Sequence, residues 1–154
     1  MSTLDILLWP DRRLSQKCRV VDAFDKNLQT LAHDMLDTMY AATGRGLAAP
    51  QVGQMMRMFV MDAGWKSDAP TPLICVNPKF QEIGPDTRVG MEQCLSIPDR
   101  PINVRRFSEI DLHWTDLENR AQSCRMTGDA AVIAQHEIDH LDGRVILDIK
   151  EPAA

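Results

Sequence analysis

A histidine pair near the C-terminal end is the feature that most constrains this chain. His136, Glu137 and His140 form an H-E-x-x-H pattern inside an apolar run that begins near Gly128. Residues four apart share one face of a helix, so both imidazoles can bind one metal ion. Glu137 then lies beside any water that this ion holds. The pattern predicts a metal-binding helix, and the alternative of two solvated histidines on a surface helix depends on whether a third ligand exists.

The composition indicates a globular protein without a polyanionic or membrane partner. The chain has 154 residues, of which 44% are hydrophobic and 25% charged, and its formal net charge is −5. This length can bury a substantial core. Lys and Arg cluster only in pairs, so we expect no nucleic-acid partner. No apolar run approaches the roughly 18 residues that span a bilayer. The first ten residues resemble neither a secretion signal nor a transit peptide, so we expect a cytoplasmic protein.

Hydrophobic periodicity predicts an α+β fold in a single domain over residues 1–154. Residues 24–40 have helical spacing, with Asp22 or Asp25 as N-cap. We expect strands over residues 57–61, 72–76, 110–114, 121–126 and 145–147, and an irregular segment over residues 91–98. Asn77-Pro78 is expected to end the second strand. The resulting fold is antiparallel sheets around a C-terminal metal-binding H-E-x-x-H helix, with an N-terminal helix.

A glycine-rich stretch over residues 44–53 is expected to be a loop. Its small side chains exclude a helix interior and argue against a core strand, and it lacks the Lys-Ser or Lys-Thr ending of a phosphate loop. Two interpretations stay open. The stretch is either a packed turn or a substrate-facing wall that carries Gln51.

The third metal ligand is expected upstream of the helix. Only fourteen residues follow His140, and Asp142 faces away from the site. Asp148 and Glu151 follow Gly143, which is expected to end the helix, and too few residues remain to bring them back to the histidines. Cys94 lies in a segment bounded by prolines, where its side chain can be aimed. One thiolate and two imidazoles suit zinc or ferrous iron with one open position.

The remaining histidine and cysteine candidates are weaker. His113 competes with Cys94, but it lies in the middle of a predicted strand beside Trp114. Cys18, Cys75 and Cys124 are assigned structural roles. Without a secretion signal, free thiols are expected for all four cysteines.

Three stretches together resemble the signature motifs of the peptide deformylases. They are GRGLAAPQVG at residues 44–53, EQCLSIP at 92–98 and QHEIDHLDG at 135–143, in the family's order. The resemblance implies a metal hydrolase that removes the formyl group from nascent chains beginning with formyl-methionine, releasing formate. It also implies that Cys94, His136 and His140 hold one divalent ion, ferrous iron in most members, with zinc or nickel as alternatives.

The resemblance also implies roles for residues around the metal. Glu137 would take a proton from the metal's water and pass one to the leaving amine. The Gln51 side-chain amide and the Leu95 backbone N–H would bind the oxyanion. Gly46 would run beside the substrate backbone like an added strand, and Ile133 would contact the substrate.

Three positions depart from the family's pattern. Gln93 replaces the usual glycine before the metal cysteine, so it is strained if the backbone needs φ > 0, or it narrows the cleft. Arg45 and Asp129 replace residues that are commonly apolar. Our hypothesis is that they form an ion pair that caps the side-chain pocket and weakens the preference for methionine; alternatively, both face solvent.

Other functions stay open from the sequence. One is a deformylase-like protein with an intact metal site but weak or altered N-acyl activity, which depends on whether Gln93 blocks the cleft. A general zinc endopeptidase is disfavoured by the missing downstream ligand. The chain is expected to lack the longer C-terminal extension of many bacterial members, so a transient ribosome contact is left open.

Overall fold

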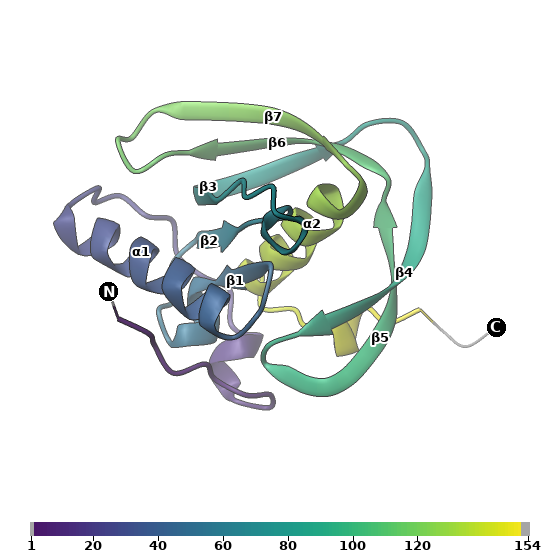
Figure 1. The fold of residues 1–154 in the computed structure, drawn as a ribbon, viewed down its shortest axis with the longest axis horizontal. Coiled ribbons are helices and arrows are strands. Elements are labelled where there is room, and N and C mark those ends of the chain that lie inside the picture. The colour runs from purple at the N-terminus through teal and green to yellow at the C-terminus, as the bar shows by residue number, and fades with distance from the viewer. Residues whose placement is uncertain (1, 152–154) are drawn as a thin grey trace.

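The fold centres on one buried helix near the C-terminus. The computed structural model describes residues 2–151, and it places helix α2 (Gly128–Leu141) between a five-stranded sheet and a two-stranded sheet (Figure 1). Nine of the fourteen residues of α2 are buried, including His136, Glu137 and His140. The helix therefore belongs to the core, and the alternative of solvated histidines is wrong.

The five-stranded sheet is antiparallel throughout and forms one wall of the core. Its strand order is β1-β2-β3-β6-β7. The strands span β1 Gly46–Ala48, β2 Met58–Met61, β3 Leu73–Glu82, β6 Glu109–Thr115 and β7 Ala121–Thr127. Phe59, Cys75 and Leu112 pack from this sheet onto Ala134 and Ile138 of α2. The predicted α+β class and antiparallel sheets are confirmed.

Strand β3 is longer than the sequence predicted. It continues through Asn77-Pro78, where the ladder to β6 shifts between Val76 and Lys79. Asn77 has φ of 50°, a left-handed conformation that asparagine tolerates, and a bulge removes the ladder hydrogen bond that Pro78 could not make. The side chain of Asn77 also bonds both backbone polar groups of Val21, at 2.8 and 2.9 Å. The prediction that Asn77-Pro78 ends the strand was wrong.

The two-stranded sheet includes residues 91–98, which we expected to be irregular. It pairs β4 (Thr87–Cys94) with β5 (Ile97–Phe107). Most side chains of this ribbon are exposed, so the apolar alternation that marks a half-buried strand is missing. Pro98 and Pro101 lie in β5, and an edge strand tolerates proline. The consequence is that Cys94 ends a strand and is fixed by a hairpin.

The glycine-rich stretch also contains regular structure. Leu47 and Ala48 of β1 are fully buried, and a 3-10 helix follows over Ala49–Val52. The expectation that its small side chains argue against a strand was wrong. α2 lies so close to β1 that a side chain at Gly46 would collide with Glu137. β1 is an edge strand, paired only with β2.

Helix α1 (Lys26–Ala41) covers the sheet beside β1 and β2, as the periodicity predicted. The Asp25 carboxylate accepts a hydrogen bond from the Leu28 N–H at 3.0 Å, so Asp25, not Asp22, caps the helix. Met35 and Met39 are fully buried against the sheet.

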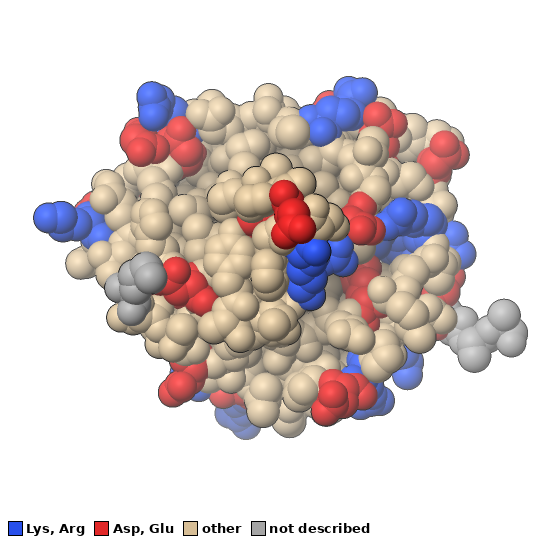
Figure 2. Space-filling view, in the orientation of Figure 1, with Lys and Arg blue, Asp and Glu red and all other residues tan. Residues whose placement is uncertain are grey.

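The chain closes with a 3-10 helix over Ile146–Asp148, where we expected a strand. The Asp148 carboxylate accepts from the Val145 N–H at 2.9 Å, which stabilises the turn. Among the described residues, no helix is long and apolar enough to cross a membrane. On the face shown in Figure 2, acidic side chains lie near the groups of basic ones.

Candidate metal centre

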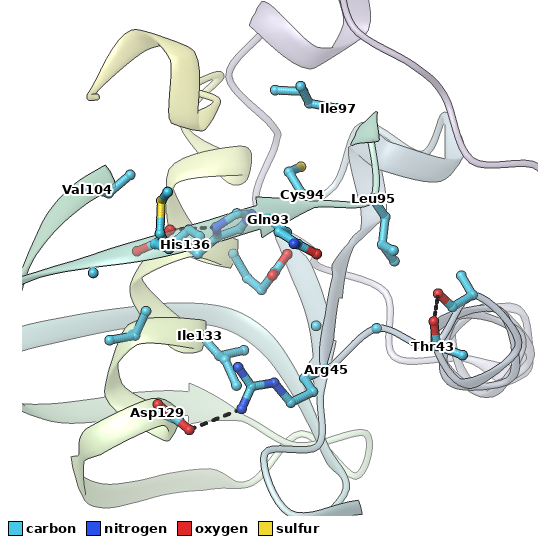
Figure 3. Close-up of a pocket in the computed structure, with 18 of the residues that line it drawn as sticks. Thr43, Arg45, Gln93, Cys94, Leu95, Ile97, Val104, Asp129, Ile133 and His136 are labelled. Atoms are coloured by element: carbon cyan, nitrogen blue, oxygen red, sulfur yellow. Dashed lines mark hydrogen bonds and ion pairs between the residues drawn. The ribbon is translucent and has the colours of Figure 1, made fainter. Parts of the chain in front are cut away.

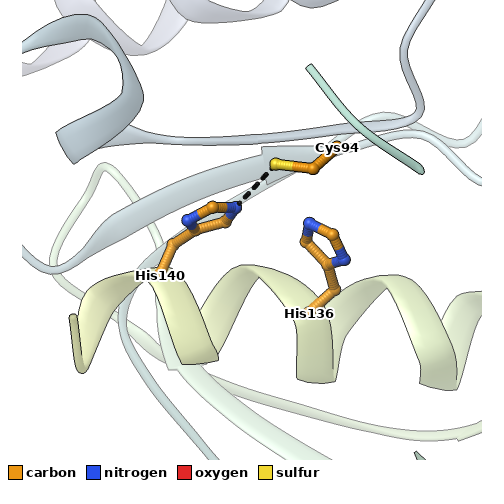
Figure 4. Close-up of side chains that lie close together, drawn as sticks. All are labelled: Cys94, His136 and His140. Atoms are coloured by element: carbon orange, nitrogen blue, oxygen red, sulfur yellow. Dashed lines mark hydrogen bonds between the residues drawn. The ribbon is translucent and has the colours of Figure 1, made fainter. Parts of the chain in front are cut away.

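Three side chains from two elements converge in the core beside the cleft. Cys94 comes from the end of β4, and His136 and His140 come from α2 (Figure 4). Their ligand atoms lie within 4.8 Å of one another, and the Cys94 Sγ is 3.4 Å from the His140 Nε2. All three are buried. These spacings fit one ion with sulfur at about 2.3 Å and nitrogen at about 2.0–2.1 Å. The donor set indicates a single metal-ion site.

The competing ligands lie elsewhere. His113 is exposed on β6. The Asp142 carboxylate binds Arg57 at 2.9 Å, and Glu151 binds Arg105 at 3.1 Å. Within residues 2–151, no other group of three His, Cys, Asp or Glu side chains has metal-ligand spacing. All four cysteines are free thiols; Cys18 and Cys75 are buried and Cys124 is exposed.

A buried carboxylate orients His136. The Glu92 Oε1 lies 2.9 Å from the His136 Nδ1, so an Nδ1–H donates to Glu92 and Nε2 is left for the metal. Burial alone would raise the pKa of Glu92, but hydrogen bonds from Arg106 and His136 outweigh it and lower the pKa to about 2. Glu92 therefore stays ionised and raises the basicity of its histidine.

An arginine completes this support. The Arg106 guanidinium donates two hydrogen bonds to Glu92, both of 2.8 Å, and a third to Asp139 of α2. Arg106 is buried, so its charge is matched within the core. Sequence reasoning missed Glu92, Arg106 and Asp139. Glu92 and Asp139 lie inside the motifs EQCLSIP and QHEIDHLDG, which was the available signal. Arg106 lies in the pair Arg105-Arg106, for which the sequence suggested no role.

Gln51 faces the metal ligands from the 3-10 helix after β1. Its Oε1 accepts from the Ala48 N–H at 2.9 Å, which fixes the amide orientation. Its Nε2 is then 3.0 Å from the Ser96 Oγ and 3.7 Å from the Cys94 Sγ. Leu95 follows Cys94 in the hairpin turn and also lines the cleft. A neutral donor and a turn backbone therefore lie beside the Cys94 sulfur.

Glu137 is a buried carboxylate at the cleft surface. Among the described residues its Oε1 has no hydrogen-bond partner, and burial raises its pKa to about 7. Its Oε2 lies 2.5 Å from the position that a Cβ on Gly46 would occupy. A carboxyl group with this pKa can both accept and return a proton near neutral pH.

The cleft has a volume of about 550 Å³ and collects most of the predicted site residues. It is lined by Gly46, Gln51, Cys94, Leu95, His136 and Glu137, and by the predicted pocket residues Arg45, Gln93, Asp129 and Ile133 (Figure 3). His140 lies behind this surface, against Cys94. The interpretation of residues 44–53 as a wall of the site agrees with this geometry.

Two of the three unusual residues form the expected ion pair. The Arg45 Nη1 lies 3.1 Å from the Asp129 Oδ2, and the two side chains are 37% and 63% exposed, so the pair also faces solvent. A residue that the sequence did not single out joins them, because the Arg88 Nη2 lies 3.2 Å from the Asp129 Oδ1. One carboxylate therefore binds two guanidinium groups at the edge of the cleft.

Gln93 is the third unusual residue, and its backbone is unstrained. Gln93 is not among the residues with positive φ. It lies in β4, where the register of the ladder to β5 shifts between Glu92 and Cys94. Of the two alternatives for Gln93, strain from φ > 0 is therefore excluded. Gln93 does line the cleft, so it takes up space that a glycine would leave free.

Known proteins resemble this chain along nearly its whole length. A family model described as polypeptide deformylase matches residues 3–153. A peptide deformylase of Zymomonas mobilis is 41% identical over 96% of this chain and 86% of its own length. One of Alkalilimnicola ehrlichii is 43% identical over 96% and 82%.

Solved structures agree with the sequence relatives. A crystal structure of peptide deformylase from Thermotoga maritima has a TM-score of 0.93 and 36% identity, covering 99% of this chain and 100% of that one. A peptide deformylase from Synechococcus elongatus in complex with actinonin has a TM-score of 0.91 and 36% identity, covering 96% and 80%. Sequence and fold therefore point to the same family.

Proposed function

The chain belongs to the polypeptide deformylase family, and from that premise we propose how its residues bind and hydrolyse formylated nascent peptides. It is a hydrolase with one metal-ion site. The substrate is formyl-methionine at the start of a nascent chain, and formate is released. The observation that carries this proposal is the convergence of a Cys-His-His group, a buried glutamate and a buried glutamine on one cleft.

Cys94, His136 and His140 hold the ion, and ferrous iron is our proposal for its native identity. Zinc and nickel would suit the same donors, because one thiolate and two imidazoles leave an open position on any of these ions. With the ion bound, the site gains a water of lowered pKa and a means of polarising the formyl carbonyl.

Glu137 acts as the general base and then the general acid. It removes a proton from the attacking water and delivers one to the amine that leaves. Its burial and its pKa of about 7 support both steps, since the proton can move either way near neutral pH. The free Oε1 gives the proton a place to bind.

Gln51 and Leu95 stabilise the charge that develops on the formyl oxygen. The Gln51 Nε2 is held toward Cys94 by the bond between its Oε1 and the Ala48 N–H. The backbone N–H of Leu95 is the second donor, in the turn beside the ligand cysteine. Donors fixed before the reaction need no reorganisation when the oxyanion forms.

The substrate backbone runs along Gly46, and its first side chain lies near Ile133 and Gln93. β1 is an edge strand, so a peptide can pair with its free side. The Arg45–Asp129 pair restricts this pocket and weakens the preference for methionine. Hydrolysis rates for peptides starting with formyl-Met, formyl-Leu and formyl-Ala test this point. A strong, undiminished methionine preference would contradict it.

Formate release from a formyl-Met peptide by protein holding one ion per chain tests the function itself. An acetyl-Met peptide of the same sequence is the control, because its larger acyl group should not be removed. No formate at full metal content would instead favour a different N-acyl substrate. We place this reaction in the cytoplasm, and co-sedimentation with ribosomes would test for a transient ribosome contact.

A further inference from the structure

Arg45 and Arg88 form a carboxylate-binding wall around Asp129 at one end of the cleft. We propose that this wall favours formylated peptides that carry an acidic side chain at their second or third residue. The inference rests on the proposed function and adds a substrate class to it.

The three residues of the wall come from separate elements. Arg45 precedes β1, Arg88 lies in β4 and Asp129 lies in the first turn of α2. Arg45 bonds one carboxylate oxygen of Asp129 and Arg88 bonds the other, at 3.1 and 3.2 Å. Among residues 2–151, neither guanidinium makes another hydrogen bond. Since each guanidinium has five N–H donors, most of them remain free to bind a further carboxylate.

The wall has one more positive charge than negative charge. Two guanidinium groups share the Asp129 carboxylate, whose pKa is lowered by its hydrogen bond with Arg45, so it stays ionised. Beyond the wall, the cleft lining includes the basic residues Lys66 and Arg106 and the acidic residues Glu92, Asp99 and Glu137. The excess is local, because the chain as a whole has a formal charge of −5.

The spacing along α2 places Asp129 about two helical turns from Glu137. Asp129, Ile133 and Glu137 are four residues apart and lie on one face of the helix, and Figure 3 shows Ile133 between the ion pair and His136. Eight residues of helix rise about 12 Å. An extended peptide advances about 3.3 Å per residue, so a rise of about 12 Å matches about three to four residues, and the wall borders the first side-chain pocket on the side away from Glu137. A glutamate side chain at the second or third position reaches it.

The cleft is open where such a side chain would enter. Gly90 lines the cleft two residues after Arg88, and a Cβ at Gly90 would meet no atom within 4 Å. The side chains of Arg88 and Asp129 are 47% and 63% exposed. A peptide can therefore reach the free donors of Arg88 without moving the core.

Peptide pairs that differ only in charge test the wall. The pairs are formyl-Met-Glu-Ala against formyl-Met-Gln-Ala, and formyl-Met-Ala-Glu against formyl-Met-Ala-Gln, with kcat/KM measured by formate release. Exposed ion pairs contribute up to about 1 kcal/mol, so we expect a preference for glutamate of about three- to fivefold in at least one pair.

Variants with opposite expected effects separate binding from folding. Arg45→Gln and Arg88→Gln should each bring the Glu/Gln ratio toward one. Asp129→Asn should raise the ratio, because it removes the competing carboxylate and frees both guanidinium groups. Arg105→Gln is the matched control, since Arg105 binds Glu151 outside the cleft and should leave the ratio unchanged.

A ratio near one in both pairs, or variants that slow all four peptides equally, would overturn the inference. Turnover of the glutamine peptides would then show that the proposed function stands without it. Failure to hydrolyse any of the four peptides at full metal content would instead count against the proposed function.

Discussion

Gly46 and Glu137 approach each other more closely than any residue with a side chain at position 46 would permit. A Cβ on Gly46 would lie 2.5 Å from the Glu137 Oε2 and 3.0 Å from the Ile133 Cγ2. The missing side chain is what lets edge strand β1 pass directly over the carboxylate. The glycine therefore positions the proposed general base as well as leaving room for substrate.

Gly46→Ala should displace Glu137 and lower kcat while leaving the metal in place. We expect a loss of at least about 100-fold, the lower end of what general acid–base catalysis contributes. Gly90→Ala adds the same methyl group to the same cleft without a contact within 4 Å, so its loss should be much smaller. Formate release and metal content measured together check this, and equal losses in the two variants would contradict it.

Cys94→Ala should lose the metal, because two imidazoles alone leave the ion with too few protein donors. Cys124→Ala is the control, since Cys124 is exposed on β7 and is not part of the ligand group. Metal content after extensive dialysis is the measurement. A Cys94→Ala protein that keeps one ion per chain would show that the ligand assignment is wrong.

Arg106→Ala should destabilise the fold strongly, because it leaves Glu92 and Asp139 without a cation in the core. Removing one partner of a buried pair costs about 3–5 kcal/mol. The neighbouring Arg105 binds Glu151 at the surface, so Arg105→Ala should cost less than about 1 kcal/mol. Urea unfolding of the two variants measures the contrast, and similar losses would mean that the Arg106 network contributes little.

Stability should fall in acid partly through Glu92. Its folded pKa is lowered from 4.5 to about 2, so the stabilisation is complete above pH 4.5 and disappears as the pH drops toward 2. The shift corresponds to about 3 kcal/mol at most. Urea unfolding of metal-free protein at pH 6 and pH 3 should show a smaller decrease for Glu92→Gln than for the native chain. Identical decreases would exclude Glu92 as a contributor.

Elements with one buried face were predictable from the sequence. Helix α1, helix α2 and strand β6 were predicted close to their observed bounds, because their apolar residues repeat at the period of their structure. Strand β7 was also predicted close to its bounds, although most of its side chains are exposed. The β4–β5 ribbon was missed because it exposes most of its side chains and so has no such period. In addition, Pro98 and Pro101 made the start of β5 look irregular in sequence.

The site was predictable where chemistry dictates residue type. Cys94, His136 and His140 were recognisable as ligands because few residues bind these ions, and all three converge in the structure. Arg106 and Arg88 were not recognisable, since an arginine in a buried network and one on a surface look alike in sequence. Their roles follow from which strand of the ribbon faces α2, and no local pattern encodes that.

Formate release by the Glu137→Ala variant at full metal occupancy tests the central claim most directly. The native chain and the variant should each bind one ion, since Glu137 is not among the ligand group. The native chain should release formate from a formyl-Met peptide, and the variant should be at least about 100-fold slower. A metal-replete variant with an undiminished rate, or a metal-replete native chain that releases no formate, would contradict the account.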